Sequence, residues 1–333
     1  MNKLLNHTMQ TTENHANRRS ILVFEWLCGG GLLQQGLHPE ELSGLVAQGR
    51  AMLQAVCADF VATGADVHVP VDQRIPLEIG TKNYKMNGET PFQECLIELA
   101  KDADWVLLIA PESDGHLENC IHWLADCSTK LLNPDIEFTR LCSNKNRLQS
   151  LLSDHDIKVP AGCRADQWND FGEKLPSSNG FVIKPNDGCG GEGIEFTKSL
   201  CAGTIPTKNS DTRIEEFVPG HAVSVSAIAN LNAIELFPAL QQTFDNQPIG
   251  NFHKCTDNLD PGIATRAKKL AEQTIAALPT TTGYFGIDMV IGARDVVIEV
   301  NPRITMSYPV LRDKLNVNMA ELMLRCKRIE APV

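Results

Sequence analysis

The sequence predicts an α/β domain with a parallel sheet, followed by a region in which helices and strands are mixed in the α+β manner. Apolar runs alternate with segments of helical periodicity at the start of the chain, and short strands of an antiparallel kind follow. The length of 333 residues is enough for two or three domains with cores of their own. We expect a flexible polar tail at 1–19, an N-terminal α/β domain at 20–134, a small central lobe at 135–217 and a C-terminal lobe at 218–333.

The N-terminal domain is expected to alternate strands and helices. Its first strand ends at Glu25 and runs into a glycine turn that contains Gly30. Open parallel sheets place functional groups at the carboxyl ends of their strands, so this turn and the segment 111–115 are candidates, with ordinary tight turns as the alternative. The expected strands are 21–25, 67–69 and 105–109, and the expected helices are 42–60, 91–101 and 117–125.

The rest of the chain has a less regular pattern. The central lobe is expected to contain a helix at 144–152 and short strands at 181–183, 194–196 and 213–218. The C-terminal lobe is expected to contain strands at 222–229, 233–240, 284–291 and 296–300, helices at 262–278 and 317–325, and a polar loop at 250–260.

The composition excludes several classes of protein. Acidic residues outnumber basic ones by 41 to 30, and a net charge of −11 repels the phosphates of nucleic acids and anionic membranes. No apolar run is long enough to cross a bilayer. The 11 cysteines lack the spacing of a zinc site and are typical of reduced thiols in the cytoplasm. We therefore expect a cytoplasmic protein that acts on small molecules, with a homodimer as its only expected assembly.

A glycine-rich segment follows the strand that ends at Lys184. A dinucleotide-binding fingerprint would need a helix directly after the glycines, but residues 194–196 form a strand pattern, and no Gly-Lys-Ser/Thr completes a Walker loop. Glycines free backbone N–H groups to surround phosphate oxygens, while a lysine on the strand supplies a fixed cation. The segment is a candidate nucleotide lid, with a plain hairpin as the alternative, and its glycines are Gly188, Gly190, Gly191 and Gly193.

Two acidic residues interrupt apolar strands near the end of the chain. Asp288 and Glu299 lie in such strands, and Asn301 shares a face with Glu299 because strand side chains alternate. Carboxylate and amide oxygens without histidine or cysteine suit Mg²⁺ or Mn²⁺ shared with substrate phosphates. Arg303 adds a cation at the strand end. The alternative is that these acids pair with arginines for structural reasons.

These motifs in combination resemble the ATP-grasp superfamily of carboxylate–amine ligases over roughly residues 145–307. The resemblance implies an ATP-grasp architecture with an N-terminal pre-ATP-grasp domain, in which ATP lies between two sheets. By position, Lys145 and Lys184 correspond to the lysines that face the phosphates, and the four glycines correspond to the lid. The implied hinge beside adenine is Glu215, Glu216, Phe217 and Val218, and the implied metal ligands are Asp288, Glu299 and Asn301.

Three segments resemble a narrower branch of this superfamily, the tyramine–glutamate ligases of methanofuran-type cofactor synthesis. They are the turn after Glu25, the segment 49–53 and the segment 301–307. This likeness implies that ATP phosphorylates a carboxylate, expected to be glutamate, and that an amine then displaces phosphate to form an amide. Arg303 and Lys184 are the expected catalytic cations. The expected substrate residues are Glu25, Gly30, His253, Lys254 and Ser307.

Two other functions are compatible with parts of the sequence. An NAD(P)-dependent oxidoreductase would use the N-terminal sheet for its dinucleotide, which a spectrum with NAD(P)H would detect. A non-catalytic regulatory protein would bind nucleotide without turnover, and phosphate release in the presence of an acid and an amine would exclude it. The full set of metal-ligand candidates favours the enzyme.

Overall fold

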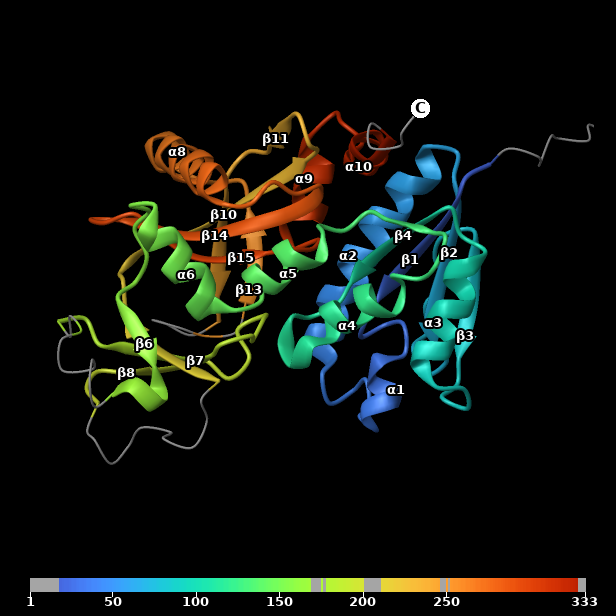
Figure 1. The fold of residues 1–333 in the computed structure, drawn as a ribbon, viewed down its shortest axis with the longest axis horizontal. Coiled ribbons are helices and arrows are strands. Elements are labelled where there is room, and N and C mark those ends of the chain that lie inside the picture. The colour runs from blue at the N-terminus through green and yellow to red at the C-terminus, as the bar shows by residue number, and fades with distance from the viewer. Residues whose placement is uncertain are drawn as a thin grey trace, which may run out of the picture.

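The computed structural model describes residues 18–168, 175, 178–200, 211–245, 250 and 252–328, so most of the expected tail lies outside the described residues. Figure 1 shows three sheets, one in the N-terminal part, one in the small central part and one in the C-terminal part. No described helix is both long and apolar enough to cross a membrane.

The N-terminal sheet is entirely parallel, with the strand order β3-β2-β1-β4-β5. Along β1, Ile21 and Val23 face a core with α2, whereas Leu22 and Phe24 face a core with α3 and α4. Apolar residues on both faces are what a parallel sheet covered on two sides requires. The elements are β1 (Ser20–Glu25), α1 (Gly31–Gln35), α2 (Ser43–Ala62), β2 (Asp66–Asp72), β3 (Lys82–Met86), α3 (Phe92–Lys101), β4 (Trp105–Ile109), α4 (His116–Trp123) and β5 (Lys130–Leu131).

The central sheet is small and antiparallel, with the strand order β6-β9-β7-β8. Its own core includes Trp168, Phe181 and Ile214. The glycine-rich segment connects β7 to β8 and will be called the glycine loop, residues 186–194. The strands are β6 (Gly162–Arg164), β7 (Phe181–Pro185), β8 (Glu195–Thr197) and β9 (Thr212–Glu216).

The C-terminal sheet is antiparallel and has the order β13-β12-β10-β14-β15, with β11 paired to β10. Val225 and Ile287 face a core with α5, α6 and α8, whereas Ile228 and Tyr284 face α9 and α10. The elements are α5 (Ile136–Cys142), α6 (Lys145–Asp154), β10 (Gly220–Ala229), β11 (Ile234–Leu236), β12 (Leu240–Phe244), β13 (Phe252–Thr256), α8 (Pro261–Ala277), β14 (Gly283–Gly292), β15 (Val296–Asn301), α9 (Ser307–Lys314) and α10 (Met319–Arg328).

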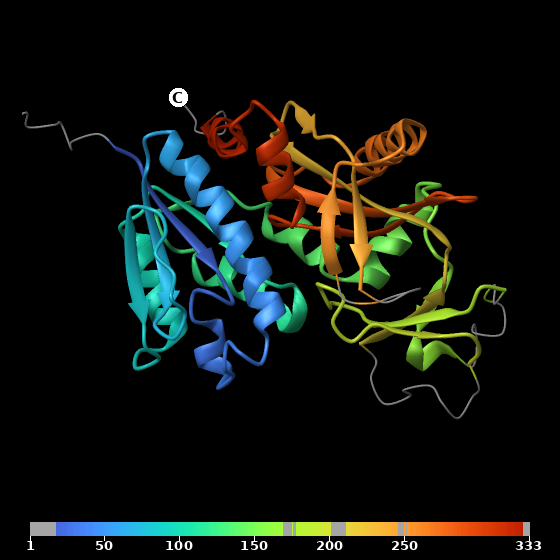
Figure 2. The same ribbon diagram turned by 180° about the vertical axis from the view of Figure 1, so that it is seen from behind.

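The N-terminal sheet and the C-terminal sheet share one hydrophobic core, because α2 packs between β1 and the helices α9 and α10. Figure 2 shows α2 running along this junction. Polar contacts reinforce the packing, since Asp59 on α2 accepts hydrogen bonds from Tyr308 Oη at 2.8 Å and from Arg312 Nε at 2.7 Å. The N-terminal domain and the C-terminal lobe are therefore packed as one body, to which the central sheet is attached.

Several elements differ from the sequence-based expectations. The helices α5 and α6 fall within the expected central lobe, but their apolar residues belong to the core of the C-terminal sheet. The expected strand at 233–240 is divided between β11 and the start of β12, and the segment 250–260, expected as a polar loop, contains β13. Strand β13 pairs only with β12, so it is an edge strand that tolerates polar side chains.

Candidate active site

A cavity of about 400 Å³ opens between the central sheet, the C-terminal sheet and helix α2. This volume is in the range of pockets that hold small molecules. The cavity collects residues from all three parts of the chain, among them Gln48, Met52, Lys184, Gly190, Gly191, Glu215, Glu216, Phe217, Val218, Asp288, Glu299, Asn301, Arg303 and Ser307.

Lys184 is a buried cation in the wall of this cavity. It lies near the end of β7, and its Nζ is 2.5 Å from Oε1 of Glu215 on the neighbouring strand β9. Burial lowers the pKa of Lys184, and the charge of Glu215 opposes this effect. Burial would raise the pKa of Glu215, but Lys184 and Arg213 outweigh it and hold that pKa below its ordinary value. The side chain of Lys184 is thus held in one place.

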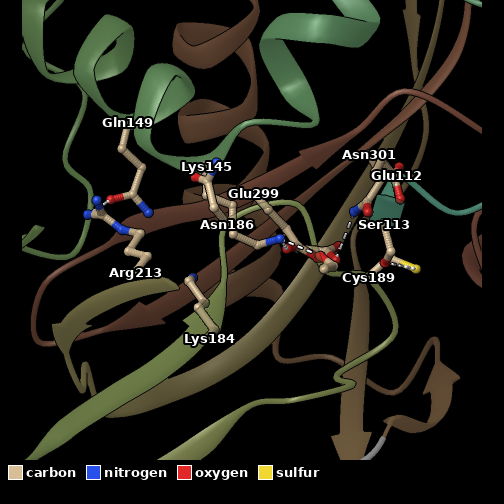
Figure 3. Close-up of polar contacts among 12 residues, drawn as sticks. Glu112, Ser113, Lys145, Gln149, Lys184, Asn186, Cys189, Arg213, Glu299 and Asn301 are labelled. Atoms are coloured by element: carbon tan, nitrogen blue, oxygen red, sulfur yellow. Dashed lines mark hydrogen bonds and ion pairs between the residues drawn. The ribbon is translucent and has the colours of Figure 1, made fainter. Parts of the chain in front are cut away.

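A polar network fixes the other end of Glu215. Its Oε2 accepts hydrogen bonds from Arg213 Nε at 2.8 Å and from Gln149 Nε2 at 3.2 Å. Figure 3 shows Arg213 beside Gln149. Glu215 was expected as a hinge residue beside adenine, yet its side chain is fully engaged in this network. Contacts to a base would therefore come from the backbone here.

Lys145 connects the glycine loop to a candidate metal ligand. It is the first residue of α6, its backbone N–H donates to Asn186 O at 3.0 Å, and its side chain is buried. Its Nζ donates to the carbonyl oxygen of Gly188 and is 3.4 Å from Oε2 of Glu299. Lys145 therefore lies beside the wall of the cavity and reaches it through Glu299, whereas Lys184 lines the cavity itself.

The glycine loop adopts backbone conformations that favour glycine. Gly190, Gly191 and Gly193 have φ values of 65°, 86° and 67°, in the left-handed region that side chains with a Cβ rarely adopt. The loop also approaches α2, because a Cβ added at Gly190 would lie 3.5 Å from Leu45 Cδ2. The loop thus covers the side of the cavity that faces the N-terminal domain.

Asp288 and Glu299 form a carboxylate pair across β14 and β15. The strands are antiparallel and pair these two residues directly, so their side chains share a face. Burial, together with the charge of Glu299, raises the pKa of Asp288 to about 6. Asp288 accepts hydrogen bonds from Asn301 Nδ2 at 3.1 Å and Gln242 Nε2 at 3.2 Å.

This arrangement fits a divalent cation. A cation bound between the two acids would relieve the repulsion that raises the pKa of Asp288, and carboxylate and amide oxygens are the ligands that Mg²⁺ prefers. Asn301 would use its amide oxygen, because its nitrogen donates to Asp288. Among the described residues no group of three or more His, Cys, Asp or Glu is placed to hold a metal, so phosphate oxygens would have to complete the coordination.

Arg303 is held by a residue that the sequence analysis did not single out as a site residue. Its Nε and Nη2 donate to Oε2 of Glu112 at 3.1 and 3.0 Å, and its Nη1 donates to Ile304 O at 3.2 Å. Glu112 is buried, and the side chain of Arg303 is 12% exposed. Burial lowers the pKa of Arg303, but the charge and hydrogen bonds of Glu112 together with the charges of Cys189 and Glu299 outweigh it and raise that pKa above its ordinary value. The only hint in the sequence was that Glu112 lies in the segment 111–115 after a strand of the parallel sheet.

The remaining hinge residues lie at the far end of the cavity. Glu216 forms an ion pair with Arg294 and accepts the N–H of Ala161 at 2.8 Å. Phe217 and Val218 line the cavity, and the ring of Phe217 is perpendicular to that of Phe196 at a centroid distance of 5.2 Å. Phe217 and Val218 therefore offer an apolar surface against which a nucleobase could pack.

The expected substrate residues are not all brought together. Ser307 lines the cavity and is buried, with its Oγ 3.8 Å from Cys255 Sγ. His253 is exposed and lies 3.1 Å from Asp245, and Lys254 is exposed on β13. Neither belongs to the described residues that line the cavity.

Glu25 and Gly30 also lie outside the described lining of the cavity. Glu25 is buried at the end of β1, accepts the N–H of Cys28 at 2.7 Å and packs so tightly on α2 that a Cβ at Gly49 would meet its carboxylate at 2.5 Å. Burial raises the pKa of Glu25 to about 7. Gly30 packs against Met86, where its φ of 109° favours glycine.

Helix α2 and Met306 contribute to the cavity in a way that could not be read from the sequence. Met52 and Gln48 lie one turn apart on α2, and Met306 lies just before α9. Helical periodicity alone made Met52 look like a core residue. Only the packing of α2 against the C-terminal lobe shows that this face of the helix borders a cavity.

Comparisons with known proteins agree with this geometry. The model of the ATP-grasp domain matches residues 142–307, and the model of the pre-ATP-grasp 3 domain matches residues 65–137. The tyramine–L-glutamate ligase of Methanocaldococcus jannaschii is 23% identical over 311 residues, which are 92% of this chain and 88% of the relative. The enzyme of the same name from Methanocaldococcus fervens is 25% identical over 222 residues, 67% of this chain and 65% of the relative.

Solved structures show the same fold. The L-amino acid ligase of Bacillus licheniformis has a TM-score of 0.65 at 14% identity and matches 92% of this chain and 73% of its own. The D-Ala:D-Ser ligase of Enterococcus faecalis has a TM-score of 0.65 at 15% identity and matches 95% of this chain and 100% of its own.

The chain belongs to the ATP-grasp superfamily, with an ATP-grasp domain preceded by a pre-ATP-grasp domain. Family, fold and homologues together define an ATP-dependent carboxylate–amine ligase that acts on small molecules. Ligases of this superfamily use ATP and divalent metal ions. Of the three functions compatible with the sequence, the ligase is the one that these findings support.

Proposed function

We propose that the chain joins L-glutamate to an aromatic amine, tyramine or tyrosine, with Mg²⁺ or Mn²⁺ as the metal and with ADP and phosphate as the other products. The observation that carries the proposal is the convergence of Lys184, Arg303 and the pair Asp288–Glu299 on one cavity, with Lys145 ion-paired to Glu299 at its wall. Such a set can neutralise a triphosphate and an acyl phosphate at the same place. The names of the two archaeal relatives support the choice of substrates.

The reaction needs no nucleophile from the protein. A carboxylate oxygen of glutamate attacks the γ-phosphorus of ATP and ADP leaves; the amine nitrogen then attacks the acyl carbon, the bond to phosphate breaks, and the nitrogen loses a proton. Lys184 and Lys145 would hold the phosphates, and Arg303 would face the charge that develops on the acyl oxygen. A metal held by Asp288, Glu299 and Asn301 would supply further charge neutralisation at the phosphates.

The walls of the cavity suit the two substrates differently. Arg303 and Ser307 offer donors to the acid. Met52, Phe252 and Met306 line the same cavity and offer an apolar surface to an aromatic ring. Of the expected substrate residues, Ser307 is the one that we retain in direct contact with substrate.

A direct assay tests this function. The protein is incubated with ATP, Mg²⁺, L-glutamate and either tyramine or tyrosine, and the amide is sought by mass spectrometry while phosphate release is followed. Controls omit ATP, add a chelator, or replace the aromatic amine by an aliphatic amine such as putrescine. If neither aromatic amine condenses while another acid and amine give phosphate release, the substrate pair is wrong and the ligase class remains.

Two further properties are part of the proposal. Nine cysteines in the described part of the chain, all those described except Cys326, are free thiols, which is typical of a reducing compartment and supports a cytoplasmic location. A homodimer stays a prediction, and light scattering on the purified protein would test it.

A further inference from the structure

One loop of the N-terminal domain contacts both the catalytic arginine and the glycine loop. The loop spans residues 111–115 and follows β4. Glu112 holds Arg303, as described above, and the next two residues reach across to the central sheet: Ser113 Oγ is 3.8 Å from Cys189 Sγ, and the N–H of Asp114 donates to Asp187 Oδ2 at 3.0 Å. Figure 3 shows Glu112, Ser113 and Cys189 on the same side of the site as Asn301. Three separate parts of the chain therefore meet at this loop.

The way in which Glu112 holds Arg303 leaves donors free for a ligand. A guanidinium has five N–H groups, and three of those of Arg303 are used within the described residues, two by Glu112 and one by Ile304 O. One N–H on each terminal nitrogen remains. Two such donors are suited to the paired oxygens of a carboxylate or an acyl phosphate, and Arg303 lines the cavity where these would lie.

One carboxylate oxygen of Glu112 takes no part in the pairing with Arg303. Its side chain is only 6% exposed, yet within the described structure its Oε1 is buried without a hydrogen-bond partner. Both hydrogen bonds from Arg303 go to the same oxygen, Oε2. An ion pair that served only stability would favour the two-oxygen, bidentate geometry. The observed geometry instead orients the guanidinium from one side.

The backbone of the loop is strained where it meets the glycine loop. Asp114 has a φ of 54° and Gly115 a φ of 67°, and left-handed conformations are rare for a residue with a side chain. Strain of this kind persists where the surrounding structure requires it and clusters at ligand clamps. Here it accompanies the N–H of Asp114 that donates to Asp187.

We propose that the loop 111–115 completes the active site from the N-terminal domain: Glu112 is a positioning residue for Arg303, and Asp114 docks the glycine loop through Asp187. The first half of the proposal rests on the proposed function, because it assigns Arg303 to the reacting acyl group. The second half concerns nucleotide-dependent closure and does not depend on which acid and amine are joined. The N-terminal domain thus acts in the reaction as well as in packing.

Glu112→Gln tests the positioning role. The substitution keeps the shape and removes the charge, so Arg303 should lose its fixed orientation and kcat should fall by about tenfold to a hundredfold, the usual effect of a misplaced group. The KM for ATP should change little, whereas the melting temperature should fall because Arg303 loses its buried counter-charge. The control is Glu118→Gln on the nearby helix α4, which removes a more exposed acid that pairs with Arg140 of α5 and should leave kcat unchanged.

A purely structural ion pair would differ in its effect on kcat. It would also lower the melting temperature of Glu112→Gln but leave kcat at the wild-type value, and that result would overturn the positioning role. If Glu112→Gln does not fold, Glu112→Asp retains the charge but shortens the side chain, and it should lower kcat at an unchanged KM for ATP. Wild-type kcat in a folded Glu112→Asp protein would then overturn the role.

Hydrogen exchange tests the docking of the glycine loop without any ligation substrate. With a non-hydrolysable ATP analogue bound, Asp187→Ala should exchange faster than wild type at residues 187–193, whereas Asp187→Asn keeps an acceptor oxygen and should stay close to wild type. Equal exchange in wild type and Asp187→Ala would overturn the docking. If wild type forms no glutamyl amide, the proposed substrates are wrong. The docking of the glycine loop is still tested in that case, because the exchange experiment uses only the ATP analogue.

Discussion

Asp288 and Glu299 lie directly opposite each other on antiparallel strands, immediately before an irregularity in the register of β14 and β15. The cross-strand pairing puts two negative charges on one face beside a buried cavity, an arrangement that costs stability until a cation shares them. The irregularity lies between Asp288 and Met289. Bulges of this kind re-aim side chains next to active sites.

Glu299→Gln should lower turnover by at least about a hundredfold, the usual loss when one electrostatic contact to the transition state is removed. The charge is lost while the shape is retained, so the melting temperature should not fall. Phosphate release at saturating ATP and Mg²⁺ measures the effect. Asp295→Asn is the matched control, because Asp295 pairs with Arg266 on the surface at the turn between the same strands. Wild-type turnover in Glu299→Gln would disprove the metal assignment.

Lys184→Met should weaken ATP binding and preserve the fold. The ammonium is lost, but Glu215 keeps its ion pair with Arg213 at 2.8 Å, so no unpaired carboxylate is left buried. Calorimetric titration with ATP measures the dissociation constant. Lys198→Met, at an exposed position just after β8, should bind ATP like wild type. An unchanged dissociation constant in Lys184→Met would show that this lysine does not contact the nucleotide.

Gly190→Ala should weaken ATP binding by up to about 5- to 30-fold. The φ of Gly190 is 65°, and an alanine held there costs ~1–2 kcal/mol, which a free loop can avoid but a closed loop cannot. Gly44→Ala serves as control, because nothing lies within 4 Å of a Cβ added at that position. Titration of both variants with ATP measures the difference. Equal affinities would mean that the loop does not close over the nucleotide in this conformation.

Glu25→Gln should stabilise the protein above pH 7. Burial raises the pKa of Glu25 from 4.5 to about 7, so the folded state binds more protons than the unfolded state between these two values. Wild type therefore loses stability as the pH rises through this window, by ~3 kcal/mol at about 1.4 kcal/mol per pKa unit. Glu25→Gln has no carboxylate to ionise at this position, so its stability does not fall in this pH range for that reason.

Melting curves of wild type and Glu25→Gln at pH 4.5, 6 and 8 measure this effect. The two curves should nearly coincide at the lowest pH and separate progressively, with the variant melting higher at pH 8. A difference in melting temperature that does not depend on pH would contradict a protonated, buried Glu25.

The sequence predicted the N-terminal sheet well because its strands are buried on both faces and therefore read as apolar runs. It did not predict β3, since Lys82–Met86 contains two lysines and an asparagine and lies at the sheet edge, where polar residues are tolerated. The glycine loop and the pair Asp288–Glu299 could be recognised in the sequence for a different reason, because their residues are unusual for the segments in which they lie. Glycines with left-handed φ and acids inside apolar strands break the local pattern and so identify themselves.

The partners of those motifs could not be predicted. Glu112 and Arg303 are 191 residues apart in the chain, and only the packing of the N-terminal domain on the C-terminal lobe brings them to 3.0 Å. The role of Met52 was hidden in the same way, because a helix periodicity identifies an apolar face but not what that face meets. Pairings across domains depend on topology rather than on local sequence.

The core shared by β1, α2, α9 and α10 has a consequence for biosynthesis. Helix α2 ends at Ala62, but the helices that cover its outer face begin only at Ser307 and Met319 and are translated much later. A nascent N-terminal sheet therefore carries an exposed apolar helix until residues up to about 324 have emerged. We expect this early intermediate to be bound by chaperones, and premature termination before α9 to give an aggregating product rather than a free-standing N-terminal domain.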